Sequence, residues 1–336
     1  MSVGVLALTG CNSGSSTSPE TTSDKPGTTA KLTGAIKIDG SSTVYPITAD
    51  VSEKFQDANS GVSVTVSESG TGGGIKKLIA GEIDICDASR PITEEEIAKA
   101  KEAGLEFLEI PLAYDGLTVV VNPKNTWADK LTVEELKKIW GPDSTVKTWA
   151  DIRAGWPAEK IKLYGPGTAS GTFDFFTEVI MGKKGSIRSD FEPSEDDNVL
   201  VKGVEGDQYA MAYFGIAYFE ANMDKLRAVP IVNPAGEPTA PTVENVKSLK
   251  YMPLSRPLFT YVSKKAAARP EVQAFFEFYL GKAGQESVKT TGYVPFDAAT
   301  YETAIANFKS GKTGSIFSGQ TGKPVDEVLK ANATGK

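Results

Sequence analysis

The stretch from Gly165 to Phe176 holds the residue types that bind a tetrahedral oxyanion. The apolar run before it, Ile161–Tyr164, predicts a buried strand that two glycines and a proline then end. Ser170 stands where a helix N-cap is expected, and the phenylalanines after it follow helical spacing. Backbone N–H groups at such a helix start, together with the hydroxyls of Ser170 and Thr172, would point at one spot. That arrangement binds an oxyanion.

Two earlier stretches repeat this order of strand, hydroxyl-rich turn and helix. In the first, Ile36–Pro46, the turn reads Gly-Ser-Ser-Thr. In the second, a strand that begins at Val62 leads through the serine, threonine and glycine turn Ser69–Gly74 into a helix ended by Gly81. One such loop is weak evidence, because serine and threonine begin many helices as caps alone. Three in one chain indicate loops that share a ligand.

Composition and charge exclude several classes of function. The net charge of −7 and the lack of basic runs among aromatic residues argue against nucleic-acid binding. The chain has no histidine, which removes Ser-His-Asp and Cys-His catalysis, and its two cysteines are far apart. The loop Gly70–Gly74 lacks the Lys-Ser/Thr ending of a nucleotide-binding P-loop. We therefore expect no enzyme activity, no metal and no cofactor.

The first residues predict a membrane anchor. Residues 1–11 are mainly apolar and end in Leu-Thr-Gly-Cys, which resembles the bacterial lipoprotein signal and implies lipidation of Cys11. Residues 12–31 are rich in serine, threonine and proline and predict a flexible tether. No apolar run in the sequence reaches the length of a membrane span. We expect a lipid-anchored protein in the periplasm or on the outer face of the cell membrane.

After the tether, strand and helix patterns alternate, which predicts an α/β fold with largely parallel strands and helices on both faces. Capping boxes mark two helix starts, at Thr93 and Thr132, each with a glutamate three positions later. Strands are expected at Leu105–Ile110 and Leu117–Val121, separated by a turn. A further helix is expected around Gly203–Met211.

The length of the chain fits two domains. Two crossings of the chain, near residues 113–122 and 255–263, are expected to form a hinge between two lobes. The expected division is a first lobe of residues 32–116 and 263–317, a second lobe of residues 117–262, and a C-terminal tail of residues 318–336.

Four motifs, taken together, identify a family. They are Asp39–Pro46, Ser69–Lys76, Asp87–Pro91 and Ser170–Thr172. In order and spacing they resemble the phosphate-binding subunit of ABC phosphate importers, the PstS-like proteins. The resemblance implies a type II periplasmic-binding-protein fold, with two Rossmann-like α/β lobes joined by a two-strand hinge. It also implies a monomer that binds inorganic phosphate with high affinity and delivers it to the transmembrane subunits of an ABC permease.

The resemblance also implies a ligand set. The expected phosphate-binding residues are Ser42, Thr43, Val44, Thr71, Gly72, Ser89, Arg90, Asp115, Ser170, Gly171 and Thr172. The best-known family pattern has an aspartate, which accepts the phosphate proton, where this chain has Arg90, and an arginine where it has Pro166. Arg90 is therefore expected to supply the main positive charge. Asp115 is the first candidate for a replacement proton acceptor, and Asp87 is the second.

Three other classes of protein are alternatives to a phosphate receptor. An enzyme lacks support because the sequence has neither a Gly-x-Ser-x-Gly elbow nor a histidine base. A receptor for another oxyanion, such as sulfate, molybdate or a phosphonate, would use the same kind of loops. A surface adhesin or phosphate sensor would bind the ion without passing it to a permease.

Overall fold

Alternation of strand and helix at the start of the folded region produces three parallel strands. The elements are β1 (Gly34–Gly40), α1 (Tyr45–Ala58), β2 (Val62–Glu68), α2 (Thr71–Ile79), β3 (Ile85–Ala88) and α3 (Glu94–Glu102). β1 pairs in parallel with β2 on one side and with β3 on the other. Thr93 caps α3 and Thr132 caps α4 (Val133–Trp140), each through a complete capping box. Both expected helix starts are therefore confirmed.

The computed structural model describes residues 31–168, 170–194, 196–317 and 323–333. Residues 32–336 group into one unit, separate from residues 1–31. The expected signal, its lipidation site Cys11 and all but the last residue of the expected tether lie outside the described residues. Within the described ranges, no helix has both the length and the apolar character that crossing a membrane requires.

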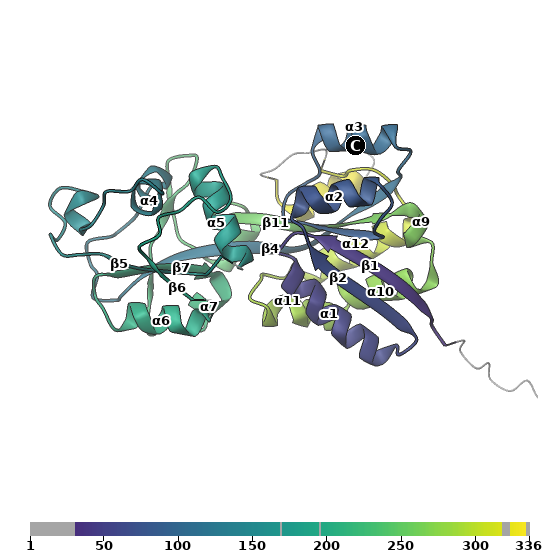
Figure 1. The fold of residues 1–336 in the computed structure, drawn as a ribbon, viewed down its shortest axis with the longest axis horizontal. Helices are drawn as coiled ribbons and strands as arrows, with labels where there is room; N and C mark the ends of the chain where they lie inside the picture. The colour runs from purple at the N-terminus through teal and green to yellow at the C-terminus, as the bar shows by residue number, and fades with distance from the viewer. Residues whose placement is uncertain (1–30, 169, 195, 318–322, 334–336) are drawn as a thin grey trace, which may run out of the picture. The chain divides into compact units, whose positions relative to one another are not determined.

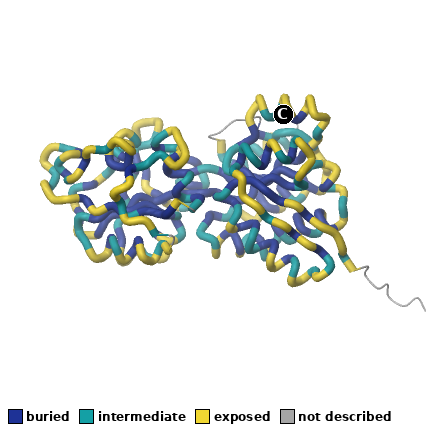
Figure 2. Tube along the Cα trace, in the orientation of Figure 1, coloured by how far each residue is buried: buried dark blue, intermediate teal, exposed yellow. Residues whose placement is uncertain are grey.

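A single long strand, β4 (Phe107–Val121), replaces the two strands and the turn expected there. Every residue of β4 is buried, and Figure 2 shows buried segments running through the middle of the fold. Pro111, which cannot donate to a ladder, lies opposite Phe259 at the point where the pairing register shifts. The expected turn is wrong because Asp115 and Gly116 pair instead with β11 (Ser255–Ser263).

The second group of elements follows β4. It comprises α4, the 3-10 helix Trp149–Asp151, β5 (Lys162–Gly165), α5 (Gly171–Met181), β6 (Glu192–Pro193), α6 (Asp197–Glu205), β7 (Ala210–Gly215), α7 (Ile216–Glu220), β8 (Arg227–Ala228), β9 (Ile231–Val232), β10 (Pro238–Thr239) and α8 (Val243–Lys247). The helix expected around Gly203–Met211 is wrong: α6 ends at Glu205, and the apolar run from Ala210 forms β7, whose first five residues are buried. The main sheet runs β2-β1-β3-β11-β4-β7-β5-β6, with β8 paired to β4.

After β11 the chain returns to the first group of strands as helices. They are α9 (Lys264–Ala267), α10 (Pro270–Leu280), α11 (Lys282–Thr290), α12 (Ala298–Ser310) and α13 (Val325–Ala333). Helix α13 lies in the expected C-terminal tail, and its Val325 and Leu329 are buried. The Val325 N–H donates to the Tyr114 hydroxyl at 2.9 Å. This segment therefore packs against the core and is not a loose tail.

β4 belongs to both halves of the sheet. Residues 107–116 of this strand pair with β11, and residues 117–121 pair with β7. Figure 1 shows β4 and β11 side by side between the elements around β1 and those around β5. We infer that residues 32–116 with 263–317 form a first lobe and residues 117–262 a second, with β4 and β11 crossing between them. The expected α/β class is confirmed. The expectation of largely parallel strands is wrong at the centre of the sheet, because β4 and β11 pair antiparallel with each other and with their neighbours β7 and β3.

Candidate functional site

A cavity of about 270 Å³ lies where two of the loops expected to bind an oxyanion, those after β1 and β2, approach the loop after β3, helix α5 and the start of β11. Its lining residues are Ser41, Ser42, Thr43, Ser69, Gly70, Thr71, Gly72, Ser89, Arg90, Asp174, Glu178, Lys184 and Arg256. The loops after β1, β2 and β3 all follow the carboxyl ends of parallel strands, where ligands bind in α/β sheets. Six of the expected ligand residues line the cavity: Ser42, Thr43, Thr71, Gly72, Ser89 and Arg90.

The first loop is held tightly against β3. The Ser41 N–H donates to the Asp87 carbonyl at 2.9 Å, and the Thr43 N–H donates to Ser41 Oγ at 3.2 Å. Gly40 has φ +150°, and a Cβ there would lie 2.1 Å from the Asp87 carbonyl oxygen. Only glycine permits this approach, which fixes the hydroxyls of Ser42 and Thr43 at the cavity wall.

The second loop presents the uncapped start of α2. Its N-cap, Gly70, has φ 77° and ψ 159°, and no side chain caps the helix. The first N–H groups of an α-helix have no partner within the helix, and here Thr71 and Gly72 line the cavity. Beneath the loop, Asp39 accepts hydrogen bonds from Ser69 Oγ, at 2.6 Å, and from Lys77. The amides are therefore positioned to bind an anion.

Arg90 lines the cavity with its charge already paired. Both oxygens of the Glu96 carboxylate accept from its guanidinium, each at 2.9 Å. Glu96 also completes the capping box of α3, so the helix start holds the carboxylate in place. The hydrogen bonds that Arg90 donates to Glu96 raise the pKa of Arg90. Arg90 is therefore a cation held in place at the cavity. The negative charge of Glu96 reduces the electrostatic field of Arg90 there.

A second arginine, Arg256 at the start of β11, was missed by the sequence analysis. Its side chain is only 13% exposed, and its Nη2 donates to Thr43 Oγ1 at 3.0 Å. Its Nε donates to Asp115 Oδ2 at 3.3 Å, and its guanidinium lies 3.6 Å above the ring of Phe175. Nη1 lies 3.7 Å from the Glu178 carboxylate. The one hint in the sequence was that Arg256 lies in the crossing expected near residues 255–263, because a charged side chain in a buried segment needs a partner.

The two expected proton acceptors do not line the cavity. Asp115 reaches it only through Arg256, because its carboxylate accepts from that guanidinium. Burial raises the pKa of Asp115, and the neighbouring Arg256 opposes that shift. The Asp87 Oδ2 accepts instead from Thr48 Oγ1 on α1 at 2.7 Å, and Thr48 also bonds Tyr279.

Two carboxylates that the sequence analysis did not single out, Asp174 and Glu178 of α5, do line the cavity. Asp174 Oδ2 accepts from the Ser42 hydroxyl at 2.7 Å and pairs with Lys184 Nζ at 2.6 Å. Ser42 lies in the loop after β1, whereas Asp174 lies in α5 and Lys184 follows it. This cluster therefore joins two distant segments of the chain at the edge of the cavity.

The start of α5 packs directly on the first loop. Thr43 Oγ1 donates to the Gly171 carbonyl at 3.3 Å, and Ser170 Oγ caps the helix by accepting from the Thr172 N–H at 3.1 Å. Ser170, Gly171 and Thr172 consequently lie beside the first loop and outside the cavity lining. Val44 is fully buried, and its N–H donates to the Ser41 carbonyl at 3.2 Å.

We expect Asp87 to make the stability of the protein depend on pH. Burial raises the pKa of Asp87 from 3.8 to about 7, so the folded state binds a proton that the unfolded state releases above pH 4. Stability should therefore fall as the pH rises from 5 to 8, by about 2–3 kcal/mol for this group. Urea unfolding of Asp87→Asn should show a smaller loss over the same range. An equal loss in wild type and variant would contradict the assignment.

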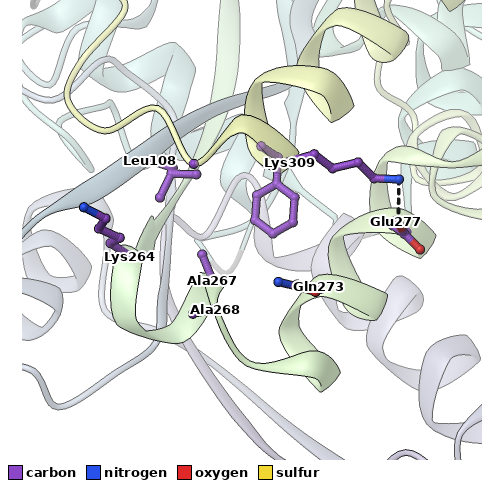
Figure 3. Close-up of a pocket in the computed structure, with 9 residues that line it drawn as sticks. Leu108, Lys264, Ala267, Ala268, Gln273, Glu277 and Lys309 are labelled. Carbon is purple, nitrogen blue, oxygen red and sulfur yellow. Dashed lines mark ion pairs between the residues drawn. The ribbon is translucent and has the colours of Figure 1, made fainter.

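A larger cavity, of about 390 Å³, lies near α9, α10 and α12 (Figure 3). Its wall includes the apolar residues Leu108 and Ala267, and its Lys309 is paired with Glu277 at 2.7 Å. None of the three oxyanion-type loops contributes to it. Among the described residues, no group of three or more histidine, cysteine, aspartate or glutamate side chains could hold a metal ion.

The fold and the cavity define a class, that of two-lobed α/β binding proteins, whose lobes close around a ligand. A model of the PBP superfamily domain matches residues 17–283. Protein SphX of Synechococcus elongatus is 45% identical over 300 residues, which cover 88% of each chain. The phosphate-binding protein PstS of Staphylococcus saprophyticus is 40% identical over 269 residues, 80% of this chain and 82% of the relative.

A solved structure, "a possible phosphate binding protein from Planctomyces limnophilus", is 48% identical with a TM-score of 0.81. It covers 83% of this chain, which in turn covers 99% of it. The chain therefore belongs to the PBP superfamily and, within it, to the PstS-like phosphate-binding proteins.

Proposed function

We propose that this protein binds one inorganic phosphate ion in the 270 Å³ cavity and delivers it to an ABC permease for phosphate uptake. The observation that carries the proposal is the convergence of the uncapped start of α2 and the buried Arg256 on one small cavity. The names of the relatives, phosphate-binding proteins among them, support the same ion.

Each lining group has a role in this proposal. The guanidiniums of Arg256 and Arg90 donate charge-assisted hydrogen bonds to phosphate oxygens. The amides of Thr71 and Gly72 donate from the positive end of α2. The hydroxyl groups of Ser42, Thr43, Thr71 and Ser89 complete the shell, since each can donate or accept.

The remaining expected ligands act more indirectly in this proposal. Asp115 orients Arg256, and Val44 fixes the first loop. Ser170, Gly171 and Thr172 bring the start of α5 onto that loop when the lobes close.

A carboxylate in the cavity would make the site selective for phosphate over sulfate. Phosphate at neutral pH carries at least one proton, whereas sulfate carries none. A carboxylate accepts that proton in a hydrogen bond but repels an anion that offers only acceptors. We place Asp174 first among the candidate acceptors because it lines the cavity, although its Oδ2 already binds Ser42 and Lys184, whereas Asp115 and Asp87 lie outside the lining.

Asp174→Asn should therefore lower the ratio of phosphate to sulfate affinity, because the amide can also donate. A shift of about tenfold is expected for one such hydrogen bond. Calorimetric titration of both anions measures the ratio. Asp115→Asn is the matched comparison, and it should weaken both anions together. An unchanged ratio in Asp174→Asn with a changed ratio in Asp115→Asn would return the acceptor role to Asp115.

The cellular setting completes the proposal. We infer a monomeric, non-enzymatic receptor, lipid-anchored at Cys11 in the periplasm or on the outer face of the cell membrane. Residues 12–31 would act as a tether that leaves the binding lobes free to meet the permease.

Titration with phosphate, sulfate and arsenate tests the binding step. We expect one site per chain that prefers phosphate to sulfate. Absence of phosphate binding by the folded protein would overturn the proposal. The delivery step is tested separately by phosphate uptake in cells that lack this protein but keep the permease. Unchanged uptake there would point to a sensor or an adhesin.

A further inference from the structure

A second cavity, of about 260 Å³, borders the first. Four residues line both cavities: Ser89, Arg90, Glu178 and Arg256. The residues that line the second cavity alone are Pro91, Phe175, Val179, Met252, Pro253, Ser255 and Pro257. They come from the loop after β3, from α5, from the segment before β11 and from the start of β11. Both lobes therefore build it.

The two cavities differ in chemistry. Loop amides, hydroxyls and charged groups line the first, whereas the walls of the second are mostly proline, methionine, valine and phenylalanine. The Phe175 ring contacts the guanidinium of Arg256 at 3.6 Å. The apolar residues of the second cavity therefore lie directly beside a cation that both cavities share. A ligand with an anionic head and an apolar group matches this pair of cavities. Inorganic phosphate has no group to place in the second one.

We propose that the site also binds phosphonates and phosphate monoesters whose apolar substituent occupies this second cavity. The proposal rests on the proposed phosphate-binding function. Arg90 and Arg256 line both cavities, so each can donate to an oxyanion in the first cavity while the substituent enters the second. The second cavity is large enough for such a substituent, because an apolar protein cavity of about 150 Å³ holds a benzene ring. Burial of an apolar group there is favourable.

Calorimetric titration with phenylphosphonate and methylphosphonate tests this proposal. Phenylphosphonate should compete with inorganic phosphate for one site, and it should bind at least about tenfold more tightly than methylphosphonate. If inorganic phosphate binds but phenylphosphonate does not, or binds no better than methylphosphonate, the second cavity takes no substituent and the proposal is overturned. If inorganic phosphate itself fails to bind, the proposed function fails instead.

The variant Val179→Trp should fill the second cavity from α5. It tests whether the apolar substituent of the ligand occupies that cavity. It should weaken phenylphosphonate binding by about tenfold and leave inorganic phosphate within about twofold. The matched control is Val199→Trp on α6, where the valine is 49% exposed and lines neither cavity. Val179→Ala, a milder change, should weaken phenylphosphonate by a few-fold. If both Val179 variants leave the ratio of phenylphosphonate to phosphate affinity unchanged, the substituent lies elsewhere and the proposal is wrong.

Discussion

Replacing Arg256 with alanine should weaken phosphate binding by at least about 3 kcal/mol, roughly a hundredfold or more in Kd. Arg256 is the more buried of the two arginines at the cavity, with its side chain 13% exposed against 35% for Arg90. Its partner Asp115 would lose the cation that opposes its burial, so the variant carries the cost of either an unpaired buried carboxylate or its protonation. Arg256→Lys should give an intermediate loss, because lysine keeps the charge but not the planar fork.

Two controls separate binding from folding in this prediction. Arg90→Ala should cost only about tenfold, because Glu96 already shares the Arg90 charge. The double variant Arg256→Met with Asp115→Leu removes both members of the buried pair. A thermal unfolding experiment should show that this variant is folded, although it should lose phosphate affinity. A Kd unchanged in Arg256→Ala, or a larger loss in Arg90→Ala, would contradict the assignment of Arg256 as the main cation.

Gly171→Ala should keep the lobes from closing while leaving each lobe folded. A Cβ on Gly171 would lie 2.5 Å from Thr43 Cα and 2.8 Å from the Thr43 nitrogen, and backbone atoms cannot move aside as a side chain can. Alanine otherwise suits this position, the first residue of α5. We expect phosphate affinity to fall by about tenfold or more, since overpacking of this kind costs about 1–3 kcal/mol.

Small-angle X-ray scattering measures the closure of the two lobes directly, as a change in the radius of gyration. The radius of gyration of wild type should decrease on addition of saturating phosphate, and that of Gly171→Ala should change less. Gly215→Ala is the matched control, because its added Cβ would meet its nearest atom at an ordinary 3.5 Å. Equal compaction in wild type and Gly171→Ala would show that the contact between α5 and the first loop is not part of closure.

The loops at the site could be predicted from the sequence because their signals are local. Hydroxyl and glycine residues between a strand and a helix set the position of Thr43, Thr71 and Ser170 whatever the rest of the chain does. The capping boxes of α3 and α4 were predictable for the same reason.

Arg256 could not be predicted in this way, because its role depends on pairing between distant segments. It enters the site only because β11 pairs with β4 and sets Arg256 opposite Asp115. The same pairing overrides the turn expected from Tyr114 to Gly116 and makes β4 one strand. Helix α13 was missed because its helical residues follow a glycine- and serine-rich stretch and its burial depends on the first lobe.

A crystal structure of the protein with bound phosphate tests the central claim most directly. We predict one phosphate ion in the 270 Å³ cavity, with its oxygens about 2.7–3.2 Å from the Arg256 guanidinium and from the first amides of α2. Phosphate at another place, such as the cavity of Figure 3, would contradict this account, as would phosphate in the cavity that contacts neither Arg256 nor those amides.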